Sequence, residues 1–306
     1  MWYLCVDPLL MLCMCCRVYL WFDGPCSSFT HDLFVQLASQ AYDDCRKDAL
    51  ALQVIQLFKL IFDELDLGLY LFPYRVIPSR TGKTMAAGGI IEVVPKCESR
   101  DEIGKQGFPN LYEYFEHKFG REDGQKFEAA RRNLVRSLAA YAVVCFILQI
   151  KDRHNGNVMY DNQGHLIHID FGFLLGISPG GNLGFENAGF KLTKEMMQVM
   201  GRDNDSEQYN YFQRLVARAF LAARKHADAI TSLVHALADS GLDCYNFPDT
   251  LEKVGRCFCF CICMCTMMVV KYSSLTHSHF VSVSVCVVKG NTITTYQHTN
   301  KQQSAH

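Results

Sequence analysis

The sequence predicts an α+β protein with two lobes, a small lobe of one helix and short strands followed by a larger, mostly helical lobe. Three observations carry this prediction. Apolar residues recur at helical spacing between residues 50 and 65, and β-rich segments follow up to residue 94. Helix formers fill two later blocks, 110–149 and 193–239. Between these blocks, the pattern over 158–169 is typical of a β-hairpin.

The composition fits a globular chain and excludes several classes of protein. The 306 residues are 49% hydrophobic and 20% charged, with a net charge of -1. Such a chain is long enough to bury a large core and too apolar to be disordered. Its charge does not suit a basic nucleic-acid-binding protein, so we expect no nucleic acid as partner. No apolar run reaches the roughly 18 to 20 residues of a membrane-spanning helix.

Eleven of the fifteen cysteines lie near the two ends of the chain. The run Cys257–Cys265 alternates with other residues, so a strand would place its thiols on one face. It lacks the paired spacing and the histidines of a zinc site. The cysteine-poor middle is typical of a reducing compartment. We interpret 1–41 as a low-complexity N-terminal segment and 255–306 as a Cys-, Val- and Ser-rich tail, both outside the core fold.

The small lobe is expected over residues 42–95. The apolar stripe of its helix consists of Leu50, Val54, Leu57, Ile61 and Leu65. Gly68 is the expected stop of this helix. Strands are expected at 69–72 and 74–77, on either side of Pro73, and at 89–94. The polar segment 79–89 is expected to be a turn.

The large lobe is expected over residues 96–254. Its helices are predicted at 110–119, 125–149, 193–200, 207–224 and 227–239. The apolar run 139–150 is too short to span a membrane and therefore predicts a helix buried in the core. Gly241 is the expected C-terminal cap of the last helix. The hairpin strands are predicted at 158–160 and 166–169, with the turn at 161–164.

Four polar residues gather around the open end of this hairpin. Asn157 and Asp170 lie on opposite strands, so antiparallel pairing brings them together. Their amide and carboxylate oxygens are ligands that Mg²⁺ prefers. Asp152 and His154, in the loop before the hairpin, are suited to orient an attacking hydroxyl and accept its proton. Kinases share one arrangement of these residues: an aspartate, an asparagine five residues later, and Asp-Phe-Gly after a hairpin. An ordinary hairpin with polar loop residues is the alternative.

The order Asp152-Arg-His154, followed by Gly-Asn-Val-Met and later His-Ile-Asp170-Phe-Gly, resembles the phosphatidylinositol 3-/4-kinase family. The flanking segments 43–53, 71–76, 89–95 and 178–186 are similar to the alpha class of type III phosphatidylinositol 4-kinase. The resemblance covers roughly residues 43–247.

This resemblance implies a two-lobed kinase-like fold with a truncated small lobe. It also implies a lipid kinase that uses ATP and Mg²⁺ to phosphorylate phosphatidylinositol at the 4-hydroxyl. Glu92, Val93 and Val94 would form the hinge that binds adenine through backbone groups. Asp48 and Tyr74 would line the inner end of the nucleotide pocket. A core role for Tyr74 and a helix-terminal role for the Asp48 carboxylate are the alternatives.

The same resemblance assigns the reacting groups. Asn157 and Asp170 would hold magnesium, and Asp152 and His154 would act on the inositol hydroxyl. Residues 172–191 would form the activation loop. No Lys or Arg occurs between 173 and 190, which favours plain phosphatidylinositol over its phosphorylated forms. The alternative is a loop that is merely flexible, with the substrate recognised elsewhere.

The resemblance also implies a location and partners. Family members act on lipid at the cytoplasmic face of membranes, so we expect a cytoplasmic protein that attaches peripherally to membranes containing phosphatidylinositol. Adaptor subunits of the kind the family uses remain open as partners.

Two departures from the family pattern stand against activity. The position of the phosphate-binding lysine falls on Gln40, and residues 1–41 contain nothing similar to a phosphate-covering loop. The resemblance ends near Val254, so the kinase core is expected to be cut at both ends. The alternative function is therefore a catalytically inactive kinase fragment with at most an interaction role. Lys47 is the candidate cation that would replace the missing lysine.

Overall fold

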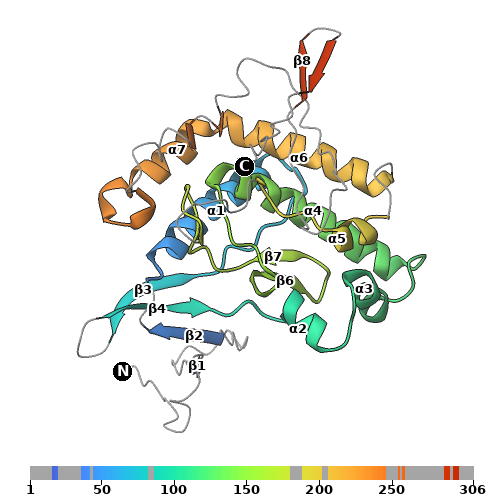
Figure 1. The fold of residues 1–306 in the computed structure, drawn as a ribbon, viewed down its shortest axis with the longest axis horizontal. Coiled ribbons are helices and arrows are strands. Elements are labelled where there is room, and N and C mark those ends of the chain that lie inside the picture. Colours follow the sequence, from blue (N-terminus) through green and yellow to red (C-terminus); the bar gives the residue numbers. More distant parts are fainter. Residues whose placement is uncertain are drawn as a thin grey trace, which may run out of the picture.

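The computed structural model describes residues 16–19, 36–41, 44–81, 86–179, 188–201, 206–245, 254–255, 257–258, 286–289 and 292–295. Figure 1 shows a small sheet-containing part below a layer of long helices, with the β6–β7 hairpin between them. This arrangement confirms the predicted α+β, two-lobed fold. The cysteine run of the tail lies almost entirely outside the described residues.

An antiparallel sheet and one helix form the small lobe. The strands lie in the order β1-β2-β4-β3. Their bounds are Cys16–Tyr19 for β1, Gln36–Ala41 for β2, Val76–Thr81 for β3 and Ala86–Glu92 for β4. Helix α1 spans Arg46–Glu64 and packs against the large lobe and β3. Of its predicted apolar stripe, Leu50, Val54 and Ile61 are buried, whereas Leu57 and Leu65 are half-buried. Strand β2 thus extends the sheet upstream of residue 42.

The strand predicted at 69–72 was wrong, and the strand predicted at 74–77 was right only in its second half, because β3 begins at Val76. Pro73 cannot donate a hydrogen bond to a sheet. The Phe72 amide instead donates to the Tyr141 hydroxyl of the large lobe at 3.3 Å. Leu71 and Tyr74 are both buried, so this stretch packs against the large lobe as an unpaired extended segment.

The predicted turn at 79–89 is in large part a pair of strands. β3 runs to Thr81, and β4 starts at Ala86. A side chain at Gly89 would come within 2.9 Å of the Ile77 carbonyl oxygen and 3.1 Å of the Cys45 sulfur. Glycine therefore permits the close approach of β4 to β3 and to the start of α1.

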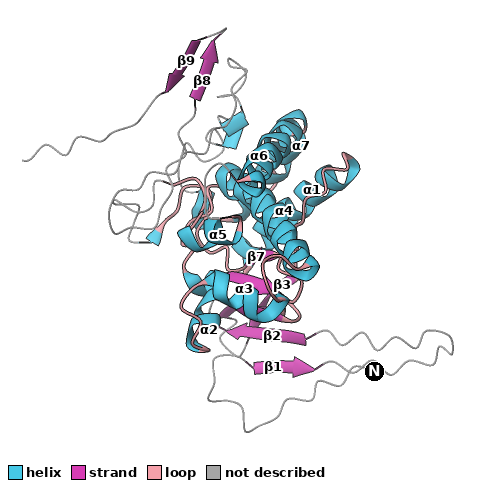
Figure 2. Cartoon of the chain, turned by 90° about the vertical axis from the view of Figure 1, so that its right-hand side faces the viewer, coloured by secondary structure: helices cyan, strands magenta, loops and turns pink. Residues whose placement is uncertain are grey.

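Helices around a central apolar helix form the large lobe. Their bounds are Arg100–Lys105 for α2, Leu111–Phe119 for α3, Gln125–Leu148 for α4, Lys194–Val199 for α5, Glu207–Lys225 for α6 and Ala227–His235 for α7. Figure 2 shows α4 beside α6 and above the strands. The run 139–148 lies inside α4 and is almost fully buried, which confirms the predicted core helix.

The last predicted helix is shorter than expected. α7 ends at His235, a 3₁₀ turn covers Ala238–Ser240, and Gly241 follows with a left-handed φ of 72°. Strand β5, Cys97–Ser99, and helix α2 were missed by the sequence analysis. Ser99 and Glu102 form a capping box at the start of α2, a signal that was present in the sequence. Within the described residues, no helix combines the length and apolar character that crossing a bilayer requires.

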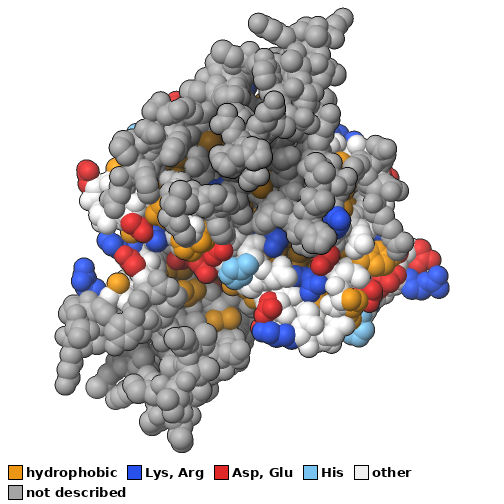
Figure 3. Space-filling view, viewed as in Figure 1, with side chains coloured by type: hydrophobic (Ala, Val, Ile, Leu, Met, Phe, Trp, Pro, Cys, Tyr) orange, Lys and Arg blue, Asp and Glu red, His pale blue; other side chains and the backbone are white. Residues whose placement is uncertain are grey.

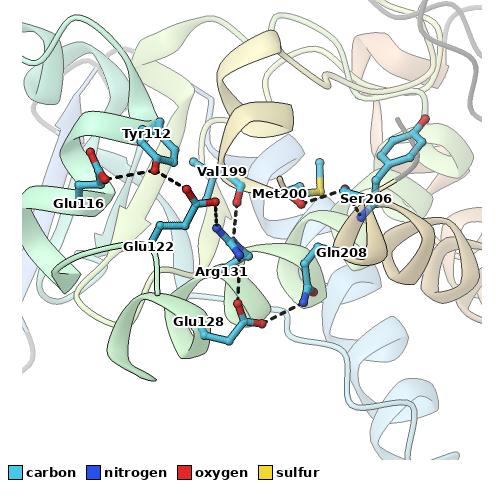
Figure 4. Close-up of polar contacts among 10 residues, drawn as sticks. Tyr112, Glu116, Glu122, Glu128, Arg131, Val199, Met200, Ser206 and Gln208 are labelled. Atoms are coloured by element: carbon cyan, nitrogen blue, oxygen red, sulfur yellow. Dashed lines mark hydrogen bonds and ion pairs between the residues drawn. The ribbon is translucent and has the colours of Figure 1, made fainter. Parts of the chain in front are cut away.

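A polar network fastens the far edge of the large lobe (Figure 4). Arg131 on α4 pairs with Glu122 and Glu128 and donates to the Val199 carbonyl oxygen at the end of α5. Glu128 also accepts from Gln208 on α6. The network joins three helices and contains none of the predicted site residues, so we assign it to stability.

The hairpin between the lobes consists of β6, Val158–Asp161, and β7, Leu166–His168, with β5 paired to β6. Asp161 organises its turn. One carboxylate oxygen accepts from the amides of Gln163 and His165, both at 2.8 Å, and the other lies 2.8 Å from the His165 ring. Gly164 has φ 89° and faces Ala130 of α4 too closely to carry a side chain. The turn thereby fixes the hairpin on α4.

We expect Asp161→Ala to destabilise the fold by about 2 to 3 kcal/mol at pH 7, because two backbone amides lose their acceptor in a largely buried turn. Burial acts to raise the pKa of Asp161, but the hydrogen bond and charge of His165 outweigh it and hold this pKa below its usual value. The stabilisation is therefore complete above the unfolded pKa of about 3.9 and is lost as pH falls through the lower folded pKa.

Urea unfolding of both chains at several pH values measures this difference in stability. The exposed Asp123→Ala variant is the control for removal of a carboxylate. A gap between wild type and Asp161→Ala that stays constant down to pH 2 would contradict the assignment.

Candidate active site

The loop 150–157 joins α4 to β6 and carries two of the predicted residues. Asp152 in this loop and Asp170 after β7 both have φ 60°, a left-handed conformation that costs a non-glycine residue about 1 to 2 kcal/mol. Arg153, only 2% exposed, donates to the Ile169 carbonyl oxygen at 2.7 Å and to that of Asp170. This buried guanidinium holds the loop and the Asp170 backbone together and compensates for the strain.

Asn157 and Asp170 lie side by side at the open end of the hairpin, as the pairing pattern predicts. The Ile169 amide donates to the Asn157 carbonyl oxygen at 3.2 Å, which places Asp170 one residue beyond a paired position. The Asn157 side chain is 5% exposed, and its amide nitrogen donates to the Asp152 carbonyl oxygen at 3.0 Å. Its amide oxygen is therefore the atom available as a ligand. The Asp170 side chain is exposed, with one oxygen accepting from the Gly172 amide at 3.3 Å.

This pair fits Mg²⁺. It offers two hard oxygen ligands, one of them on an exposed side chain. Among the described residues, no three His, Cys, Asp or Glu side chains are grouped so as to hold a metal ion. Mg²⁺ in phosphate-transferring sites needs only one or two protein ligands, because phosphate oxygens and waters complete its shell.

His154 and Asp152 face each other across the start of the loop. The His154 ring is exposed, and its Nδ1 accepts from the Gly156 amide at 3.0 Å. Its Nε2 lies 4.0 Å from the Asp152 carboxylate. With Nδ1 used as an acceptor, a neutral ring carries its proton on Nε2. In this tautomer the ring has no free acceptor nitrogen, so the arrangement favours the Asp152 carboxylate as an acceptor; the catalytic roles of both residues stay predictions.

Asp48 and Tyr74 of the small lobe contact the backbone of the Asp170-Phe-Gly segment. An Asp48 carboxylate oxygen accepts from the Phe171 amide at 2.7 Å. The Tyr74 hydroxyl accepts from the Asp170 amide at 3.3 Å, and its ring stacks on Phe171. Burial raises the pKa of Tyr74, so its hydroxyl stays neutral. The two residues hold the Asp-Phe-Gly backbone against the small lobe, and their contact with nucleotide stays a prediction.

The segment 92–94 is where the chain leaves the small sheet for the large lobe (Figure 1). Glu92 exchanges hydrogen bonds with Arg75, its amide donating to the Arg75 carbonyl oxygen and its carboxylate accepting from the Arg75 amide, both at 2.8 Å. Val94 is buried and Val93 is half-buried. This position suits a hinge, whose binding of adenine stays a prediction.

Two residues, Gln40 and Lys47, bear on the position of the missing phosphate-binding lysine. Gln40 on β2 pairs with Gly89 on β4, so its position in the sheet is defined. Lys47 on α1 directs its amine to Asp243 of the large lobe at 3.2 Å and is only 18% exposed. The structure thus gives no support to Lys47 as the replacement for a phosphate-binding lysine.

Sequence reasoning missed three further cations of the site, Lys151, Arg153 and Lys191. Their side chains donate to backbone carbonyl oxygens of the two loops. The sequence shows that these residues are charged, but it does not show which carbonyl oxygens their side chains reach. It therefore gave no signal that they belong to the site.

The two lobes, with an Asn and an Asp at the open end of the hairpin between them, define a kinase-like fold. The profile of the family described as phosphatidylinositol 3- and 4-kinase matches residues 35–247, and the chain belongs to this family. This confirms the resemblance seen in the sequence.

Several relatives of this chain are named as phosphatidylinositol 4-kinases. The chain is 49% identical over 216 residues to phosphatidylinositol 4-kinase stt4 of Schizosaccharomyces pombe, covering 71% of this chain and 11% of the relative. It is 46% identical over 218 residues to phosphatidylinositol 4-kinase alpha 1 of Arabidopsis thaliana, covering 71% and 10%. It is 45% identical over 223 residues to phosphatidylinositol 4-kinase beta 2 of the same plant, covering 71% and 19%. The chain thus matches about a tenth of the length of the first two relatives and about a fifth of the third.

Proposed function

We propose that this chain forms the catalytic core of a lipid kinase that transfers the γ-phosphoryl group of ATP to the 4-hydroxyl of phosphatidylinositol. The proposal rests on one observation. Asn157 and Asp170 lie close together beside the loop 150–157 that carries Asp152, and residues of both lobes make contacts there. The names of the relatives, phosphatidylinositol 4-kinases, support the lipid substrate and the position of transfer.

Asn157 and Asp170 would hold Mg²⁺, which neutralises charge on the phosphate oxygens when it is bound. Asp152 would accept the proton of the inositol hydroxyl, while His154 keeps that carboxylate oriented through Nε2. The 92–94 hinge would bind adenine, and Asp48 and Tyr74 would keep the Asp-Phe-Gly segment aligned beneath the nucleotide. The work of these side chains is positioning, which supplies most of the catalysis in phosphoryl transfer.

Substrate choice is proposed from the loop that follows Asp170. Residues 173–190 contain no Lys or Arg, although 180–187 lie outside the described residues. On the face seen in Figure 3, acidic and basic side chains are interspersed over the described surface. A headgroup with extra phosphates would find little positive charge in the loop. Action at membranes, peripheral attachment at the cytoplasmic face and adaptor subunits belong to this proposal.

The experiment incubates the purified chain, and a Gln40→Lys variant, with ATP, Mg²⁺ and vesicles of defined composition. We expect phosphatidylinositol to be used at least about tenfold better than its phosphorylated forms, a difference that corresponds to about 1.4 kcal/mol. The expected product carries the new phosphate on the 4-hydroxyl. A 3-phosphate product, or equal use of phosphorylated lipids, would overturn the substrate assignment.

A second candidate is an inactive kinase fold with an interaction role, and Gln40 is the observation that favours it. The fold and the hairpin site would then be retained without turnover. Absence of lipid phosphorylation by both chains in the same experiment would favour this candidate.

A further inference from the structure

Lys191 is the last residue of the loop 172–191 that follows Asp170, and its side chain is hydrogen-bonded to the loop 150–157. Its amine donates to the Arg153 carbonyl oxygen at 2.7 Å and to the Asn155 side-chain oxygen at 3.4 Å. In the opposite direction, the Lys151 amine donates to the Ala188 carbonyl oxygen at 3.0 Å. The segment 188–191 and the loop 150–157, here called the catalytic loop, are therefore joined by two charged donors, each of which donates to a backbone carbonyl oxygen.

Lys191 donates to the carbonyl oxygen of Arg153, the residue that links Asp152 to Asp170. Arg153 stands between Asp152, whose backbone is left-handed, and His154. Its guanidinium holds the carbonyl oxygen of Asp170, which is also left-handed. Lys191, Arg153 and Asp170 thus form a chain of contacts from the end of one loop to the aspartate of the other. Both aspartates have a strained, left-handed backbone that surrounding contacts hold in place. Movement of Arg153 would therefore shift both of them.

We propose that Lys191 is a positioning residue for phosphoryl transfer, which fixes the backbone that carries Asp152 and His154. This inference rests on the proposed function, because the reaction that Lys191 would support is the proposed lipid phosphorylation. A hydrogen bond from an ammonium group is stronger than one from a neutral donor. The Lys191 contact therefore holds the loop in the conformation in which the Asp152 carboxylate faces the hydroxyl of the substrate.

The chain offers matched variants for a test. Lys191→Met keeps the length of the side chain and removes its charge and donors. Lys191→Arg keeps both, and a cavity of about 20 Å³ beside Lys191, Asn155 and Thr193 gives the larger head group room. Lys194→Met is the control, because Lys194 is an exposed lysine at the start of α5, only three residues away.

The first measurement is hydrogen exchange of backbone amides in the purified chain. Gly156 donates to the His154 ring and Asn157 to the His154 carbonyl oxygen, so their amides report on the loop. In Lys191→Met we expect these amides to exchange about tenfold to a hundredfold faster, as loss of a charged hydrogen bond predicts. Amides in α4 and α6 should keep their wild-type rates. Lys191→Arg should restore most of the protection, and Lys194→Met should match wild type.

The second measurement is the kinetics of lipid phosphorylation by the same variants. Lys191→Met should lower kcat by about tenfold to a hundredfold while KM for ATP changes little, because the loop acts on the transferred group and not on the adenine. Lys191→Arg should recover most of kcat.

The outcomes separate the inference from the proposed function. Equal exchange at Gly156 and Asn157 in Lys191→Met and Lys194→Met would overturn the inference, as would a uniform rise in exchange across the whole large lobe. An unchanged kcat in an active Lys191→Met chain would overturn it as well. If no variant, wild type included, phosphorylates lipid, the result counts against the proposed function alone, and the exchange data decide the role of Lys191 in holding the loop.

Discussion

In a chain that carries Gln40→Lys, replacing Asp170 by alanine is expected to lower lipid phosphorylation by about a thousandfold. Loss of one well-placed group that stabilises developing charge costs roughly a hundred- to a thousandfold in rate. Asp170 stands at the upper end of this range, because it is the only carboxylate of the proposed pair that holds Mg²⁺. Its side chain is exposed, so the fold should survive the change.

The backbone conformation of Asp170 requires a second variant and a matched control. Alanine tolerates φ 60° less well than aspartate, and this strain is separate from the loss of the carboxylate. Asp170→Asn keeps a side chain that suits this conformation and removes the charge. Asp66, exposed with φ 44°, is the control, since Asp66→Ala introduces similar strain at a distance from the site.

The measurements are turnover across a range of Mg²⁺ concentrations and the thermal midpoint of each chain. Both Asp170 variants should lose turnover, and added Mg²⁺ should recover part of it only in Asp170→Asn. Asp170→Ala and Asp66→Ala should have similar midpoints. Turnover near wild type in Asp170→Asn would remove the charge of Asp170 from the mechanism.

The parts of the fold that the sequence predicted are those with strong local signals. α4 and α6 follow from long amphipathic or apolar periodicity, and the hairpin follows from Asp161 and Gly164 between two β-rich runs. The unpaired stretch around Pro73 was misassigned, because its hydrogen bond goes to Tyr141, 69 residues away from Phe72. Local pattern cannot show that a β-rich segment will pair with a helix side chain instead of a strand.

The same distinction holds for the site. Asn157 and Asp170 were predictable because one hairpin brings them together, and Asp152 lies in the adjoining loop. The contact of Asp48 with the Phe171 amide spans 123 positions, and that of Lys191 with Arg153 spans 38. Such contacts depend on how α1 and the later loop pack against the hairpin. Resemblance to a family pointed to Asp48, whereas nothing in the sequence pointed to Lys191.

Gln40→Lys is expected to raise lipid phosphorylation by about a hundred- to a thousandfold over the chain as it stands, the effect of one well-placed charged donor. Gln40 lies within the range that the family profile matches, on a strand paired with β4, which ends at the hinge. In the kinases that the sequence resembles, this position carries the lysine that contacts the nucleotide phosphates. A glutamine amide has no charge with which to neutralise them.

The described cations near the site do not offer a substitute. Lys47 pairs with Asp243, and Arg153 donates to backbone carbonyl oxygens. Lys151 and Lys191 also donate to carbonyl oxygens of the two loops. Moving any of them to the phosphates would break a contact that holds the fold or the catalytic loop. None of these four described cations can therefore supply the charge without such a loss, so we test restoring it on β2.

The test compares ATP binding and lipid phosphorylation by the wild-type chain, Gln40→Lys and Gln53→Lys. Gln53 is exposed on α1, so its replacement adds the same charge to the small lobe away from β2. ATP affinity and kcat should both rise in Gln40→Lys alone, because a lysine at this position acts on the phosphates in the ground state and in the transition state. Robust activity of the wild-type chain would refute the claim that Gln40 limits it. A rise in Gln53→Lys equal to that in Gln40→Lys would assign the gain to net charge and not to the β2 position.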